Sequence, residues 1–243
     1  MSRIGGALAA GARELRRTPL LLALLVFTPA YVIYVFTLVA PDGPARLHVG
    51  GETVVTTLPK AFPAFTTPMN AALLSAIAGL FLIGSAAAAD ARLVVAGFRA
   101  HEVVLARLGL LVGVSGVTTV VSVAVMLTTF RPERLGWFLA ATGLTALVYA
   151  MVGVLAGLLL DRLAGVYLVL FGTMLDLFVF QNPLATETPA IAAWLPGHFP
   201  LELAMAAGFT GSVDPATLAW GIGYLAAVTL AATLAFRWRS RVG

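Results

Sequence analysis

The sequence places one carboxylate, Asp176, inside an otherwise apolar run of about residues 164–181. A charged side chain near the centre of a membrane costs about 2.5–3.5 kcal/mol on insertion scales, so we expect it to face protein or water rather than lipid. Together with Gln181 and Asn182 it could line a substrate path, or it could carry a proton. Two structural alternatives stay open: a hydrogen bond that only stabilises the fold, and a helix short enough to bring Asp176 to the outer rim.

A second candidate for chemistry is Ser115, in the sequence GVSG at residues 113–116. This pattern resembles the serine motif of rhomboid-type intramembrane proteases. Such a nucleophile needs a histidine on a neighbouring span to accept the serine proton. The three histidines, His48, His101 and His198, lie in or next to predicted loops, so close helix packing explains the glycines better.

Several other kinds of chemistry can be excluded from the sequence. It contains no Gly-Lys-Ser/Thr phosphate-binding loop, and Lys60 is the only lysine, so the chain cannot hydrolyse ATP by P-loop chemistry. The lack of cysteines excludes disulfides and thiol catalysis, and no cluster of acids or histidines has metal-ligand spacing. We therefore expect this chain to hold no cofactor, and any ATP and Mg²⁺ to be bound by a partner subunit.

The elements that carry these residues are predicted to be membrane-spanning helices. Sixty per cent of the residues are hydrophobic and 11% are charged, whereas a soluble domain normally has about a quarter charged residues. Much of the surface must therefore face lipid. The net charge of +4 does not indicate nucleic-acid binding, because the cations lie at the ends of apolar runs rather than on one face.

Six apolar runs predict six spans, and hence an all-α, polytopic membrane protein that forms a single transmembrane domain over residues 1–243. The runs cover residues 20–40, 69–89, 108–129, 136–160, 164–181 and 217–236. The first run is longer than the core of a usual signal peptide, and no A-x-A site follows it, which favours an uncleaved first span.

Two further segments are predicted to lie at the membrane surface or dip into it. Residues 1–18 combine arginines with apolar residues at helical spacing, which is typical of an interfacial elbow helix. Residues 182–216 contain two apolar pieces, 190–195 and 201–209, that are too short to cross. These pieces are typical of interfacial or re-entrant helices before the last span.

Two glycine patterns predict local structure. The polar stretch 41–68 includes LHVGGETVVTTL, which could form a small hairpin around Gly50-Gly51. Gly153 and Gly157 form a G-x-x-x-G pair in the fourth span. Such pairs allow close helix contact, and we favour packing within the bundle over a seam between two copies.

The distribution of cations predicts the orientation in the membrane. With the N-terminus inside, eleven cations are cytoplasmic and four are external, as the positive-inside rule requires. The cytoplasmic set is Arg3, Arg13, Arg16, Arg17, Arg92, Arg99, Arg107, Arg162, Arg237, Arg239 and Arg241, and the external set is Arg46, Lys60, Arg131 and Arg134. We predict a multi-pass protein of the cell membrane with both termini in the cytoplasm.

Residues 90–107 form a charged amphipathic segment on the predicted cytoplasmic side. Solvated charge at the membrane surface would account for it. The functional alternative is a docking element for a cytoplasmic partner, where fixed charges give orientation and specificity. Its candidate residues are Asp90, Arg92, Arg99, His101, Glu102 and Arg107.

This layout resembles the membrane subunits of ATP-binding-cassette transporters of the second, exporter-type class, which have an elbow helix, six spans, a charged cytoplasmic helix between spans two and three, and re-entrant helices before span six. The segment DARLVVAGFRAHEVVLARL is similar to the family's coupling region, and WLPGHFPLELAMAAGFTG to its Leu-Pro element. The matching coupling positions are Asp90, Arg92, Glu102 and Arg107; those of the outer element are Leu195, Pro196, Pro200 and Glu202, with His198 between them. The Glu-Arg-Gly-Thr sequence usual after span two is absent.

The resemblance implies a permease subunit that pairs with a cytoplasmic ATPase and with a second copy or a related subunit, and that exports its substrate. A secondary transporter or channel is the main alternative, and it would depend on an ion gradient rather than on ATP. A membrane enzyme acting on lipids would need acids or histidines clustered at one face, and the sequence contains no such cluster.

Overall fold

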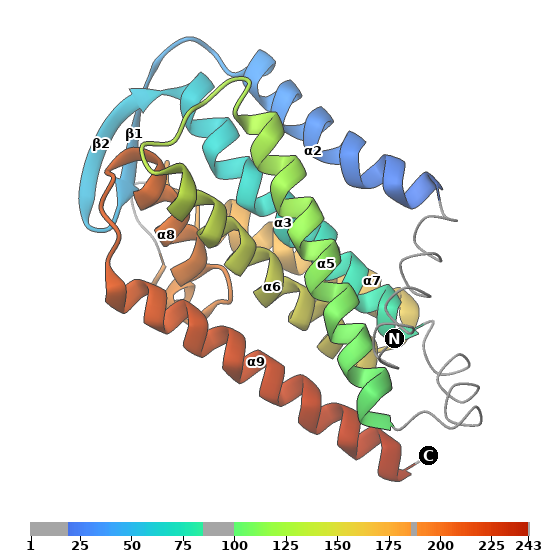
Figure 1. Ribbon diagram of the computed structural model, residues 1–243. Helices are drawn as coiled ribbons and strands as arrows, with labels where there is room; N and C mark the ends of the chain where they lie inside the picture. Colours follow the sequence, from blue (N-terminus) through green and yellow to red (C-terminus); the bar gives the residue numbers. More distant parts are fainter. Residues whose placement is uncertain (1–18, 85–99, 186–188, 243) are drawn as a thin grey trace.

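The computed structural model describes residues 19–84, 100–185 and 189–242, and these form a helical bundle with one β-hairpin (Figure 1). The predicted elbow helix over residues 1–18 lies outside this described part. In chain order the elements are α2 (Pro19–Val39), β1 (Pro44–Val49), β2 (Glu52–Thr57), α3 (Leu58–Gly84), α5 (Ala100–Met126), α6 (Leu135–Leu159), α7 (Arg162–Met174), a π-helical turn η1 (Leu175–Phe180), a 3₁₀ helix η2 (Ala190–Trp194), α8 (His198–Phe209) and α9 (Pro215–Val242).

Five helices in the described part are long and apolar enough to cross a membrane, which agrees with the predicted polytopic helical fold. They run over Leu58–Ile83, Arg107–Met126, Leu135–Leu159, Arg162–Phe180 and Pro215–Trp238, at the places predicted for the second to sixth spans. In α2 the segment Phe27–Val39 is a shorter apolar helix. Among the described helices, α2 is therefore the one that would have to supply a sixth span.

Helix α3 begins at Leu58, well before residue 69, where the sequence predicted the span to start. The early part contains Pro63 and Pro68, and prolines favour the prediction of a loop. Polar side chains bond along the helix there: the Thr67 hydroxyl donates to the Pro63 carbonyl at 2.6 Å, and Asn70 Nδ2 donates to a carbonyl one turn earlier at 3.0 Å. Both side chains are buried, so this polar, proline-containing segment forms part of the bundle interior.

The core of the bundle is the close crossing of α3 and α6. A Cβ atom at Gly153 would overlap the carbonyl oxygen of Ala76, and one at Gly79 would overlap that of Ala150. A Cβ at Gly157 would stand 3.0 Å from a backbone oxygen of α3. The predicted packing of the G-x-x-x-G pair within the bundle is confirmed.

The predicted hairpin is confirmed. Strands β1 and β2 pair antiparallel, with Val49 opposite Glu52. Gly50 and Gly51 have φ of 57° and 80°, the left-handed values that a two-residue hairpin turn of this kind requires. Alternate residues of β1 are buried and join a core cluster with α3 and α8, so the hairpin is packed against the helices.

The two short apolar pieces of residues 182–216 form η2 and α8, and neither is long enough to cross a membrane. Helix α8 packs against α6, α9 and α3, and most of its apolar side chains are buried. The hairpin and α8 lie at one end of the bundle, while the start of α5 and the C-terminal end of α9 lie at the other (Figure 1).

Helix α9 is capped by Asp214, which lies just before its first residue. The carboxylate accepts hydrogen bonds from the N–H of Ala216 at 3.1 Å and from the N–H and hydroxyl of Thr217 at 3.1 and 3.0 Å. These bonds stabilise the charged form and lower the pKa of Asp214. An aspartate at this position supplies the acceptors that the first turn of a helix lacks.

Candidate functional site

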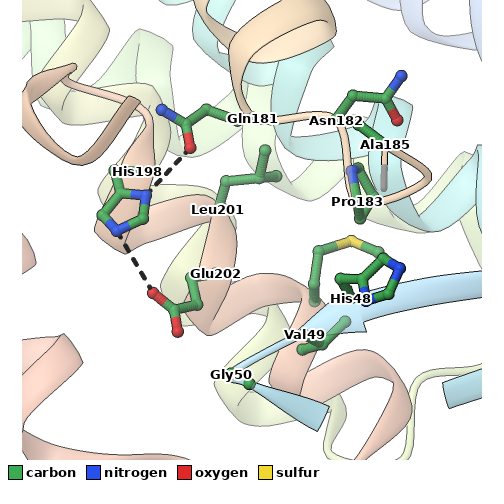
Figure 2. A pocket seen from close by; sticks show the side chains of 12 residues that line it. His48, Val49, Gly50, Gln181, Asn182, Pro183, Ala185, His198, Leu201 and Glu202 are labelled. Atoms are coloured by element: carbon green, nitrogen blue, oxygen red, sulfur yellow. Dashed lines mark hydrogen bonds and ion pairs between the residues drawn. The ribbon is translucent and has the colours of Figure 1, made fainter. Parts of the chain in front are cut away.

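A cavity of about 390 Å³ lies at the hairpin end of the bundle, and three separate parts of the chain line it (Figure 2). These are the hairpin turn over residues 48–51, the stretch 181–185 that follows η1, and one face of α8 over residues 198–205. Its polar lining comes from His48, Gln181, Asn182, His198 and Glu202. The pocket therefore brings together residues that the sequence analysis assigned to two separate sets, the substrate path and the outer element.

Backbone hydrogen bonds hold two of these parts together. The N–H of His48 donates to the Pro183 carbonyl at 2.9 Å, which fixes β1 against the stretch after η1. The Asn182 Oδ1 accepts from the N–H of Leu184 at 3.0 Å and stabilises the turn that follows. Because the left-handed turn at Gly50-Gly51 also fixes the hairpin, the pocket is a preformed part of the fold.

Behind the pocket lies Asp176, which is 5% exposed. Three donors reach its carboxylate: the Tyr149 hydroxyl, the Gly197 N–H at 3.0 Å and the Gln181 Nε2–H at 3.1 Å. A buried carboxylate is tolerated when its oxygens are satisfied in this way. The sequence left open that Asp176 makes hydrogen bonds that stabilise the fold, and such bonds are present.

The glycine at position 197 is needed for this contact. A Cβ atom there would overlap the Leu177 side chain and would stand 3.0 Å from the Tyr149 hydroxyl and 3.2 Å from Asp176 Oδ2. Gly197 immediately precedes α8, so its N–H belongs to the unpaired end of that helix. The Asp176 carboxylate therefore caps α8 from another helix, at the end where negative charge is favourable.

A π-helical turn positions these groups at the end of α7. The Gln181 N–H donates to the Asp176 carbonyl at 2.9 Å, five residues earlier, which is the π-helical pattern. Most of the α7 surface is exposed, yet Asp176 and Leu177 on this turn are buried. The turn thus directs the end of an otherwise peripheral helix into the bundle.

Gln181 connects the buried carboxylate to the pocket. Its Nε2 donates both to Asp176 and to the Ala192 carbonyl, the latter at 2.8 Å, and its Oε1 is 3.1 Å from His198 Nδ1. On the other side of the ring, His198 Nε2 lies 3.8 Å from Glu202 Oε2. Figure 2 shows His198 between Gln181 and Glu202, with His48 on the hairpin side of the pocket.

The predicted site residues at this end separate into two groups. Gln181, Asn182, His198 and Glu202 line the pocket, whereas Asp176 does not line it and is hydrogen-bonded to Gln181. Leu195, Pro196 and Pro200 do not line it: the Leu195 N–H bonds to the Ala192 carbonyl at the end of η2, Pro196 follows, and Pro200 is buried in the first turn of α8.

Sequence reasoning did not assign His48 to the site. The hairpin was predicted, but its contact with Pro183 joins segments that are far apart in the chain. No local sequence pattern predicts such a contact.

At the opposite end of the bundle the predicted coupling residues are only partly described. Asp90, Arg92 and Arg99 lie outside the described residues, and His101 and Glu102 fall in the first turn of α5. Arg107 Nη1 donates to the Leu82 carbonyl at 2.6 Å, which ties α5 to the end of α3. The Arg162 guanidinium lies over the Phe81 ring, 5.1 Å from its centroid, on the same part of α3.

Ser115 does not form a nucleophilic site among the described residues. Its hydroxyl is buried and has no hydrogen-bond partner, while its carbonyl accepts from Thr118 and Thr119 at 2.9 and 2.7 Å. His48 and His198 belong to the pocket at the hairpin end. Among the side chains that the structure describes, none is hydrogen-bonded to the Ser115 hydroxyl, so no base is in place to activate it.

The pocket offers hydrogen-bonding groups and apolar surface to a ligand. Its polar groups are imidazoles, amides and one carboxylate, and its other walls are apolar. Within the residues that the structure describes, no group of three or more histidines, cysteines and acids could hold a metal ion. Comparison with protein-family models, with curated protein sequences and with solved structures finds no match to this chain.

Proposed function

We propose that the chain is the membrane-spanning permease subunit of an ATP-driven exporter, with hydrolysis in a separate cytoplasmic ATPase. It would form the translocation path with a second copy or a related subunit. In this arrangement the pocket end faces outward, the termini are cytoplasmic, and the segment around residues 90–107 docks the ATPase. The strong excess of cations at the predicted inner segments supports this orientation.

The observation that carries the proposal is the extent of α5. This helix runs without a break from Ala100 to Met126, while its membrane-length apolar part begins at Arg107. His101 and Glu102 therefore belong to the same helix as a span that packs against α3 and α6. A force applied to the first turn of α5 would move the span directly, and the bond from Arg107 to Leu82 would pass it to α3.

ATP-driven export requires two states of the bundle that ATP and substrate both bias. Closure of two ATPase subunits would push on residues 90–107 and tilt α5 against α3. Because α3 also packs against α6, β1 and α8, this movement would reach the pocket end. There it would change the separation of the hairpin from α8, and with it the access to the pocket.

The coupling role is tested by charge reversal at Glu102. If Glu102 pairs with a cation of the ATPase, Glu102→Arg would place like charges opposite each other at the contact, which costs several kcal/mol. In a complex with the co-purified ATPase, this change should therefore reduce the stimulation of ATP hydrolysis at least about tenfold. The permease should keep its thermal stability in detergent. Glu52→Arg at the hairpin is the matched control and should leave stimulation unchanged.

A Glu102→Arg complex with wild-type stimulation and transport would remove the coupling role from this segment. Equal losses in Glu102→Arg and Glu52→Arg would contradict it as well, because Glu52 lies on the hairpin at the other end of the bundle.

A proton-coupled secondary transporter is the second candidate. The observation in its favour is the chain of hydrogen bonds that leads from the buried Asp176 through Gln181 to His198 in the pocket. Ionisable residues inside membrane proteins often serve proton transfer. This candidate predicts solute flux that follows a proton gradient and needs no nucleotide.

A further inference from the structure

The hydrogen-bond network fixes which nitrogen of His198 carries a hydrogen. The Ala192 carbonyl can only accept, so the Gln181 group facing it at 2.8 Å is the amide nitrogen. The amide oxygen of Gln181 must then face His198 Nδ1, at 3.1 Å. Because that oxygen only accepts, Nδ1 is the donor, and Nε2 of the neutral ring keeps its lone pair.

The lone pair of His198 Nε2 and the carboxylate of Glu202 thus form a pair of acceptors. The two atoms are 3.8 Å apart, which is too long for a hydrogen bond, and neither supplies a proton to the other. Their side chains are 28% and 31% exposed and line the pocket, so a ligand can reach both. These two atoms therefore offer a ligand two hydrogen-bond acceptors and no donor.

We propose that the pocket binds a small organic cation whose ammonium group donates hydrogen bonds to both His198 Nε2 and Glu202. Two acceptors 3.8 Å apart can share one ammonium nitrogen, because each such bond is about 2.8–3.0 Å long. Among the described residues that line the pocket there is no lysine or arginine, so Glu202 sets the sign of the charge there. An anion would be repelled by this carboxylate, with no permanent cation among the described lining residues to offset it.

The rest of the wall indicates the body of the ligand. Val49, Leu201 and Met205 give the pocket apolar surface beside the acceptor pair. Its volume of about 390 Å³ falls at the small end of the range for small-molecule sites. The ligand class is therefore an amine with a compact apolar or aromatic body. This inference goes beyond the proposed function, and binding is measured without ATP or a partner, so the two can fail separately.

The test compares three probes with the same phenethyl body and end groups of different charge. Binding is measured by isothermal titration against the purified chain in phosphatidylcholine nanodiscs, with empty nanodiscs subtracted. We expect phenethylammonium to bind at least about tenfold more tightly than neutral 2-phenylethanol, and 3-phenylpropanoate not to bind. Equal affinity for the alcohol or the anion, or no binding of the ammonium, would overturn the proposal.

Two variants locate the binding. Glu202→Gln should weaken phenethylammonium at least about tenfold, because it removes the charged acceptor. His198→Asn retains a donor toward Gln181 but removes the second acceptor, and should weaken it several-fold. Glu52→Gln on β2 removes an exposed carboxylate near the pocket and should have no effect. Equal losses in Glu52→Gln and Glu202→Gln would show general charge attraction and would refute the site.

Discussion

Replacing Gly153 with valine should strongly destabilise the bundle. A Cβ atom at this position overlaps the backbone carbonyl of Ala76, which cannot rotate away as a side chain would. Helices α3 and α6 would have to separate, and the contacts along their crossing would be lost. We expect the free energy of unfolding in detergent to fall by about 3 kcal/mol or more.

The measurement is a titration with a denaturing detergent, followed by circular dichroism. Gly223→Val on α9 is the matched control, because no atom lies within 4 Å of a Cβ placed there. A Gly153→Val protein as stable as the wild type would mean that α3 and α6 do not cross as closely as described.

The second large effect is expected for Asp176→Asn. Three donors meet this carboxylate, and an amide has one oxygen to accept from them. Its NH₂ group would face at least one buried donor, so the free energy of unfolding should fall by about 2–3 kcal/mol. Because Gln181 and His198 are oriented through the same network, the affinity of the pocket for phenethylammonium should fall as well.

A double-mutant cycle with Tyr149→Phe separates this network from general damage. If the hydroxyl and the carboxylate act together, the two changes should be non-additive by about 1 kcal/mol or more. Additive effects, or an Asp176→Asn protein of wild-type stability, would contradict the network. Transport that falls in Asp176→Asn by more than the loss of folded protein explains would favour a place for this residue in the substrate path.

The parts of the fold that follow from local chemistry could be predicted from the sequence. Long apolar runs predicted the later spans, and Gly50-Gly51 predicted the hairpin because few other residue pairs adopt its backbone angles. The early start of α3 was missed, since prolines normally end helices, and only the tertiary setting accommodates Pro63 and Pro68 in this one.

The site depends on contacts that no local pattern records. Gln181, Asn182, His198 and Glu202 were selected from the sequence as members of two different sets, and the fold brings them to one pocket. The partners of Asp176 were not predictable, because Tyr149 and Gly197 are separated from it by 27 and 21 residues. The same holds for His48, which reaches the pocket through its bond to Pro183.

The most direct test of the central claim, that this chain transports only when a separate ATPase drives it, is flux in sealed vesicles. The probe is radiolabelled phenethylguanidinium, a cation of the class proposed for the pocket, used once its binding to the purified chain has been measured. Its charge, retained at neutral pH, keeps leakage through lipid slow. We predict accumulation only when the chain is reconstituted with its co-purified ATPase and Mg-ATP is added, and none with a catalytically inactive ATPase. Rapid accumulation by the chain alone, driven by a proton gradient and unaffected by the ATPase, would contradict the account.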